Sequence, residues 1–143
     1  MKLDANIWGP HFWFFLHTIA LSYPKHPNAV TKKKYYDFIQ NLPLFIPVED
    51  MSKYFEKLLN LYPVAPYLDT NKALVKWMHF IHNKINERLE KNTITLTQFY
   101  DLYHQAYKPQ DLKAKEYKKT CSYILYFMVL IMLIAIIVFL YRR

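Results

Sequence analysis

Glycine and cysteine are almost absent from this chain, which has one of each among its 143 residues. With one glycine, the chain has no glycine-rich loop of the kind that holds phosphates in P-loop and NAD-binding proteins. With one cysteine, Cys121, it has no intramolecular disulfide and no Cys-x-x-Cys pair. His79 and His82 supply only half of a zinc site, and no other cysteine or clustered histidine completes it. We therefore expect no metal site, no ordinary dinucleotide-binding fold and no disulfide framework.

A basic stripe with interleaved aromatic residues is also missing, although the net charge is +8. Several basic residues lie in the segment Lys108–Lys119, where attraction to anionic lipid accounts for them. Lys32, Lys33 and Lys34 have the pattern of a solvated helix face. The sequence therefore favours a membrane, and not nucleic acid, as the partner of its basic residues.

The apolar run Tyr123–Tyr141 contains no charged residue, proline or glycine. About 20 apolar residues cross the hydrocarbon core of a bilayer as a helix, so the run predicts a single membrane-spanning helix. Only Arg142 and Arg143 follow it, which favours a C-terminal tail anchor with the preceding domain in the cytosol. The lysines before the run outnumber these two arginines and favour the same orientation.

Cys121 lies two residues before this run. A cysteine at a membrane edge is a candidate for reversible palmitoylation. An inert thiol and a disulfide between two chains are the alternatives, and the sequence leaves all three open.

Apolar residues recur at helical spacing before residue 108, and strand-like alternation is scarce. We therefore predict an all-α fold with a four-helix bundle and a short fifth helix over residues 1–107. A basic linker over 108–122, the membrane helix 123–141 and a basic tail at 142–143 are expected to follow. The expected helices are Gly9–Ser22, Ala29–Asn41, Pro47 to the residues before Pro63, Asn71–Lys91 after an Asp69 or Thr70 cap, and a fifth from a Thr95–Gln98 capping box to about Tyr107.

The fourth predicted helix carries a polar stripe beside its apolar one. His79, His82, Asn83 and Asn86 lie at offsets 0, 3, 4 and 7 and therefore share one side of the helix. Burying such groups unpaired costs about 1 to 3 kcal/mol each, so they must contact water, each other or a ligand. The stripe indicates either a ligand site or a partly exposed face.

Two stretches of the chain resemble one known family. Residues 8–13 read WGPHFW and continue through Leu16-His17 to Tyr23-Pro24, and residues 77–91 read WMHFIHNKINERLEK. They resemble the opening helix and the His-Asn-x-x-Asn flavin helix of the Erv/ALR sulfhydryl oxidases. The resemblance covers about residues 8–107 and implies a helical bundle that binds FAD.

The resemblance also implies a set of flavin-contacting residues. Matching positions on the first helix are Gly9, Pro10, Trp13 and His17. Matching positions on the fourth helix are His82, Asn83, Ile85, Asn86, Leu89 and Lys91, and Tyr103 stands where the family usually has tryptophan.

The chain departs from the family where the family carries its redox chemistry. Val48 and Met51 follow Pro47 in place of the Cys-x-x-Cys pair, which in active members passes electrons from substrate dithiols to FAD and then to oxygen. Ile46 replaces an aromatic residue, and Leu59 and Leu96 lie near the places of structural cysteines. The catalytic pair is thus absent, and we expect a redox-inactive member.

We accordingly expect a binding, structural or regulatory module at a membrane. The family pairs through its first two helices, which implies a homodimer or a heterodimer with an active relative. The alternatives are an FAD-linked thiol oxidase with an atypical mechanism and a helical bundle whose likeness is coincidental. Compact family members in large DNA viruses, together with the Lys-, Asn-, Ile- and Tyr-rich composition, favour a viral setting, in a virion or host organelle membrane.

Overall fold

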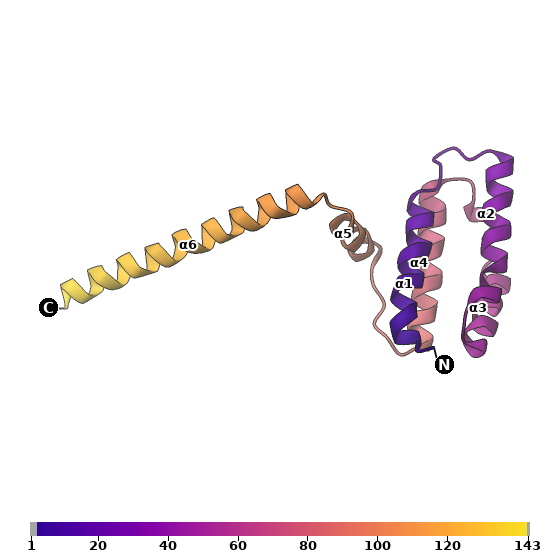
Figure 1. The fold of residues 1–143 in the computed structure, drawn as a ribbon, viewed down its shortest axis with the longest axis horizontal. Coiled ribbons are helices and arrows are strands. Elements are labelled where there is room, and N and C mark those ends of the chain that lie inside the picture. The colour runs from indigo at the N-terminus through magenta and orange to yellow at the C-terminus, as the bar shows by residue number, and fades with distance from the viewer. Residues whose placement is uncertain (1–2, 143) are drawn as a thin grey trace. The chain divides into compact units, whose positions relative to one another are not determined.

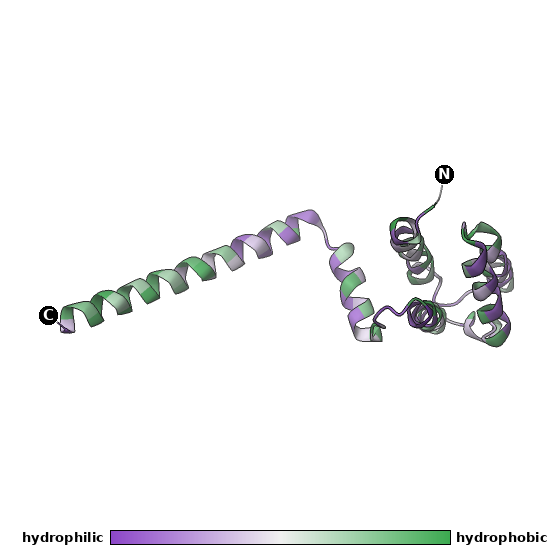
Figure 2. Ribbon diagram, turned by 90° about the horizontal axis from the view of Figure 1, so that it is seen from below, coloured by the Kyte–Doolittle hydropathy of each residue, from purple (hydrophilic) through white to green (hydrophobic). Residues whose placement is uncertain are grey.

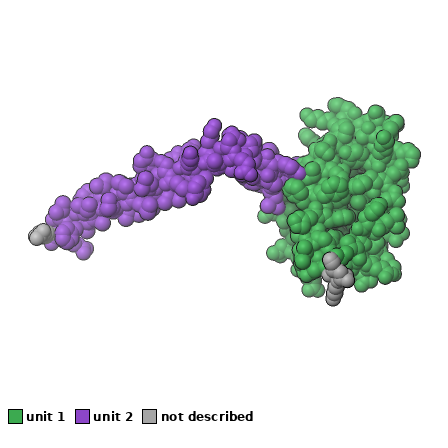
Figure 3. All heavy atoms as spheres, viewed as in Figure 1, with its two compact units in different colours: residues 1–99 green, residues 100–143 purple. Residues whose placement is uncertain are grey.

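The computed structural model describes residues 3–142, and this part of the chain forms helices and no strands (Figure 1). The chain divides into two compact units, Met1–Phe99 and Tyr100–Arg143 (Figure 3). The α-helices are α1 (Ala5–Leu21), α2 (Ala29–Asn41), α3 (Glu49–Leu61), α4 (Asn71–Arg88), α5 (Leu96–Ala106) and α6 (Gln110–Tyr141), with short 3₁₀ turns η1 (Leu42–Phe45) and η2 (Ala65–Tyr67). The predicted all-α fold class is confirmed, while the predicted domain limits stay a prediction.

Unit 1 is a helical bundle in which α1 packs along α4, and α3 joins them through the core (Figures 1 and 2). The fully buried side chains come from every helix of the unit, and the largest are Trp77, Phe55, Phe99, Leu16, Ile39, Leu74, Met78 and Ile81. Burial of a large apolar side chain contributes about 1.5 to 3 kcal/mol. The helices of unit 1 therefore share one core, and each helix buries its apolar side against the others.

Polar side chains define where several helices begin. Asp4 accepts a hydrogen bond from Asn6 N, so α1 begins at Ala5, four residues before the predicted start at Gly9. Thr70 accepts a hydrogen bond from Ala73 N, so of the two predicted caps of the fourth helix, Asp69 and Thr70, it is Thr70 that caps α4. Thr95 and Gln98 form the predicted capping box, since Thr95 N donates to Gln98 Oε1 and Gln98 N donates to Thr95 Oγ1.

Two further predicted helix limits are wrong, the start of the third helix and the end of the fourth. The third helix begins at Glu49 and not at Pro47, because Val48 is in extended backbone as its N-cap. The fourth ends at Arg88 and not at Lys91. Glu90 takes a left-handed φ of 55°, Lys91 N donates to Asn86 O, and Glu90 N donates to Glu87 O. These two bonds form a Schellman motif, whose left-handed position usually needs glycine; with one glycine in the chain, sequence reasoning had no signal for it.

Unit 2 contains the longest helix. α6 runs for 32 residues without a break, so the basic segment expected as a linker is helical from Gln110 onward (Figure 1). By length and composition α6 is able to cross a membrane. Figure 2 shows hydrophilic residues in its first turns and hydrophobic residues over the rest. Cys121 is exposed where these two parts meet.

Hydrogen bonds at one end of the bundle join α1 to α4. Asn71, the first residue of α4, donates from Nδ2 to Ala20 O at 3.1 Å, Leu21 O at 3.0 Å and Tyr23 O at 2.8 Å. The carbonyls at a helix C-terminus have no partner within their own helix. The Asn71 amide therefore caps the end of α1 from the neighbouring helix.

We predict that Asn71→Ala lowers the free energy of unfolding by about 1 to 3 kcal/mol, because partly buried carbonyls at the end of α1 lose their donor. Thermal unfolding of the full chain in detergent, followed by circular dichroism, measures the change. Asn60→Ala is the matched control, since Asn60 is exposed within α3, and it should leave the transition nearly unchanged. Equal effects of the two substitutions would contradict the capping role of Asn71.

Candidate functional site

Two histidines and a tryptophan meet between α1 and α4. Trp13 and His17 lie one turn apart on α1, and His82 faces them from α4. The rings of Trp13 and His82 are stacked, with centroids 4.0 Å apart and an interplanar angle of 9°. His17 Nε2 lies 2.9 Å from His82 Nδ1, which is a hydrogen-bonding distance. We call Trp13, His17 and His82 the histidine cluster.

Phenylalanines from two other helices enclose this cluster. The ring of Phe55 on α3 lies 6.4 Å from that of Trp13. The ring of Phe99 on α5 lies 4.7 Å from that of His17 and 5.6 Å from that of His79. Phe55 and Phe99 are both buried. The cluster thus combines hydrogen-bonding groups with apolar neighbours, and it is buried at His17 and partly exposed at Trp13 and His82.

Burial keeps both histidines of the cluster neutral. Desolvation lowers the pKa of His17 to about 3, with the charges of His82 and His79 as further causes. Desolvation also lowers the pKa of His82 to about 4, with contributions from His79 and Lys91. In a bond between two neutral imidazoles one ring donates and the other accepts. The cluster is therefore an uncharged pair near neutral pH.

The other half of the polar stripe holds the loop after α4. Asn83 Oδ1 accepts from Ile94 N at 3.2 Å, and Asn83 Nδ2 donates to Ile94 O at 2.9 Å. His79 Nε2 lies 2.8 Å from the same carbonyl oxygen, and because a carbonyl only accepts, this nitrogen carries the proton. His79 and Asn83 therefore position the loop that leads to Phe99.

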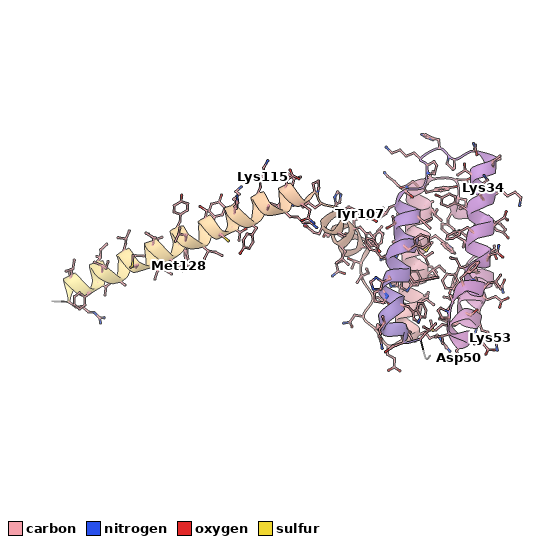
Figure 4. The ribbon with its side chains drawn as sticks, viewed as in Figure 1. Lys34, Asp50, Lys53, Tyr107, Lys115 and Met128 are labelled. Carbon is pink, nitrogen blue, oxygen red and sulfur yellow. The ribbon has the colours of Figure 1, made fainter. Side chains whose placement is uncertain are left out.

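The first turn of α3 lies one turn away from the aromatic contact with Trp13. Met51 precedes Phe55 by four residues and so shares its side of α3, while Val48 is the N-cap of that helix. Glu49 and Asp50 are exposed in the first turn, where a carboxylate is favoured by the helix dipole (Figure 4). The end of α3 near the cluster thus presents two apolar side chains and two carboxylates.

The remaining predicted site residues are spread along the two helices. Gly9 and Pro10 lie in the first half of α1. Outside the helix's own backbone and the two chain neighbours, no atom comes within 4 Å of the place that a Cβ on Gly9 would take, so packing does not require glycine there. Lys91 follows α4 and donates from Nζ to Asn6 Oδ1 at 3.2 Å. Ile85 is buried in the core, Asn86 caps the end of α4 through its carbonyl, Leu89 is exposed, and Tyr103 lies on α5 in unit 2.

Sequence reasoning did not connect Phe55, Phe99 or the partner residue Ile94 with the histidine cluster. No spacing in the sequence connects these residues to α1 or α4.

A further feature is the indole N–H of Trp8, which is buried and has no acceptor within residues 3–142. A buried donor without a partner is rare in folded proteins.

Comparison with known proteins gives one consistent result. The model of the Erv1 / Alr family matches residues 10–108. A probable FAD-linked sulfhydryl oxidase of Acanthamoeba polyphaga mimivirus is 32% identical over 109 residues, which cover 76% of each chain. The FAD-linked sulfhydryl oxidase of African swine fever virus is 29% identical over 113 residues, 79% of this chain and 90% of the viral one.

Solved structures show the same similarity. The yeast Erv1 core has a TM-score of 0.63 at 27% identity, over 76% of this chain and 86% of that one. A structure titled as the FAD binding domain of Erv1 from Saccharomyces cerevisiae has a TM-score of 0.62 at 30% identity, over 66% of this chain and 88% of that one. The bundle described above is therefore an Erv1-like fold.

We predict that acid destabilises the bundle through the histidine cluster. Below the ordinary histidine pKa of 6.5 the unfolded chain takes up protons that folded His17 and His82 exclude until about pH 4 to 3. The stability is thus undiminished above pH 6.5 and falls as the pH is lowered through this window. Between pH 7 and pH 5 the two groups should account for a loss of about 2 to 4 kcal/mol.

Urea unfolding of the full chain at several pH values measures this slope. The double variant His17→Gln/His82→Gln should show a much flatter dependence on pH, whatever its absolute stability. His26→Gln is the matched control, because His26 is exposed, and its slope should equal that of the wild type. An unchanged slope in the double variant would overturn the assignment.

Proposed function

Because the chain belongs to the Erv1 / Alr family, we propose that it is a membrane-anchored member that binds FAD but does not oxidise thiols through a cysteine pair. Its viral relatives carry the name FAD-linked sulfhydryl oxidase, and a matching yeast structure is titled as an FAD binding domain. The observation that carries the proposal is the neutral histidine cluster, enclosed by aromatic residues in a chain whose one cysteine is Cys121.

The residues present fit a flavin. A flat aromatic ligand stacks favourably on aromatic and imidazole rings, and Trp13 with His82 provides such rings at the junction of α1 and α4. The buried indole N–H of Trp8 has no acceptor among residues 3–142 and would donate to a ligand oxygen. Lys91 would place a positive charge near a pyrophosphate. When bound, FAD supplies two-electron redox chemistry.

The neutrality of the cluster supports the same assignment. A protonated imidazole pair would be a charged surface that repels Lys91 and binds water strongly, whereas two neutral rings offer one donor and one acceptor in an apolar surrounding. The lowered pKa values of His17 and His82 keep this state over the physiological range. His17 and His82 would therefore orient the ligand by hydrogen bonds without transferring protons.

The first turn of α3 supports the absence of thiol chemistry. A thiolate at a helix N-terminus is stabilised by the exposed N–H groups and the helix dipole. In this chain Val48 and Met51 occupy the positions that match the family's cysteines, and neither forms a thiolate or a mixed disulfide. Glu49 and Asp50 place two carboxylates in that turn instead. The chain would then act as a binding or regulatory module.

The anchor in this proposal is α6. With 32 residues and an uncharged apolar part at Tyr123–Tyr141, it is long and apolar enough for a single membrane-spanning helix. A second copy of the chain or an active relative is the proposed partner of the bundle. Exposed apolar side chains on α1, Ile7, Phe14 and Phe15, support such a partner.

We predict that the full chain, purified in detergent, binds FAD and shows the visible flavin absorbance band. His82→Ala should weaken binding at least about tenfold, which corresponds to a loss of about 1.4 kcal/mol from the stacked and hydrogen-bonded ring. Quenching of flavin fluorescence during a titration measures the affinity, and circular dichroism verifies the fold. His26→Ala, at an exposed position, should bind as the wild type does. No binding by the folded wild-type chain would refute the flavin proposal.

We also predict that the wild-type chain produces no hydrogen peroxide from dithiothreitol and oxygen. The variant Val48→Cys/Met51→Cys should gain this activity, because it places a thiol pair at the N-cap and in the first turn of α3, and position 51 is one turn from Phe55, which contacts Trp13. The single variant Val48→Cys is the control and should stay inactive. Peroxide release by the wild type would instead support an oxidase with an atypical mechanism.

A further inference from the structure

The first turns of α6 continue the apolar helix without a break. At 1.5 Å per residue, a helix of 32 residues is about 48 Å long, whereas the hydrocarbon core of a bilayer is about 30 Å thick. The apolar part, Tyr123–Tyr141, accounts for that core. About a dozen residues of the same rigid helix, from Gln110 to Ser122, must therefore lie at and beyond the membrane surface.

Three lysines share one side of this extension. Lys115, which Figure 4 labels near the start of α6, is followed at i+3 and i+4 by Lys118 and Lys119, and this spacing places the three on one side of the helix. All three are exposed, and none belongs to a salt bridge found within residues 3–142. Like charges at this spacing repel each other. We call these three residues the lysine face of α6.

The neighbouring carboxylates are engaged elsewhere or distant. Glu116 forms an ion pair with Lys108. Asp111 lies in the first turn of α6, where the helix dipole favours a negative charge. Neither carboxylate is found in a salt bridge with the lysine face. The face therefore keeps a local charge that an external anion could balance.

The position of the lysine face matches the lipid headgroups. Lys118 and Lys119 precede Tyr123 by five and four residues, about 6 to 8 Å along the helix axis, which is the depth of the headgroup layer. Lys119 Nζ lies 5.8 Å from the centre of the Tyr123 ring, and tyrosine is typical of that layer. Lys115 lies about 12 Å from Tyr123 along the axis, still close to a Debye length from the surface of the membrane.

We propose that the lysine face of α6 binds the headgroups of anionic phospholipids, so that the protein selects these lipids around its anchor. The proposal rests on the membrane-spanning role of α6 proposed above. Because the helix is continuous from Gln110 to Tyr141, the depth of the apolar part in the bilayer also determines the depth of the lysines. The ligand is a lipid phosphate or carboxylate, and the lysines bind it as point charges.

Lipid selection by the full chain tests the proposal. The chain is reconstituted in phosphatidylcholine vesicles that contain either phosphatidylserine or phosphatidylcholine spin-labelled on the acyl chain, and electron paramagnetic resonance measures the motionally restricted lipid. The expected preference for phosphatidylserine is about fivefold at low salt and should fall strongly at about 1 M salt, where the Debye length is about 3 Å. Lys115→Gln/Lys118→Gln/Lys119→Gln should reduce it to nearly one.

The matched control removes the same charge from unit 1. Lys34, Lys57 and Lys76 are exposed and belong to no salt bridge found in the described residues, so Lys34→Gln/Lys57→Gln/Lys76→Gln should keep the preference. Alkaline extraction of the vesicles first verifies that the chain is inserted. If the inserted chain shows no preference for phosphatidylserine, or if both triple variants lose the preference equally, then the proposed role of the lysine face is refuted, and the membrane role of α6 is not. Extraction of the chain from the vesicles overturns the membrane role of α6 as well.

Discussion

The packing of α1 against α4 is the contact on which the rest of unit 1 depends. Asn71 joins the end of α1 to the start of α4, and Lys91 reaches Asn6 at the opposite end. Between these points the hydrogen bond of His17 with His82 and the stacking on Trp13 need a defined register. A helix that slipped by one residue would rotate its side chains by about 100° and separate the two imidazoles. The site therefore exists only while this register is kept.

The bundle holds its helices together without a covalent bond between them. Trp77 donates from Nε1 to Tyr62 O at 2.9 Å, and the guanidinium carbon of Arg88 lies 4.5 Å from the centre of the Tyr54 ring, so α4 contacts both the middle and the C-terminal end of α3. Tyr23 donates from its hydroxyl to Leu68 O and orders the segment before α4. Each such bond contributes only about 0.5 to 1.5 kcal/mol, whereas apolar burial in the shared core contributes more. Disulfides are thus dispensable for this arrangement.

The proposed function assigns flavin binding and thiol chemistry to different helices of unit 1. The histidine cluster lies on α1 and α4, while Val48 is the N-cap of α3 and Met51 lies in the first turn of that helix. Phe55 contacts the ring of Trp13 one turn further along α3 than Met51. The proposed absence of a cysteine pair would therefore leave the contacts of the histidine cluster in place. This separation also makes the flavin and the thiol proposals independently testable.

The sequence by itself determined the helical class, the Thr70 and Thr95 caps and the apolar length of α6, because periodicity, capping and hydropathy are local properties. It also indicated Trp13, His17 and His82 through two motifs, but it did not show that Asn83 holds Ile94 or that Phe99 covers the cluster. Nor did it show the end of α4 at a left-handed Glu90, or that the basic segment before Tyr123 is helical. The side-chain contacts among these features depend on the tertiary structure, and the helix limits depend on the backbone conformation of the folded chain. The pairing of His17 with His82 joins residues 65 positions apart, and such contacts follow from how helices pack, which no local pattern records.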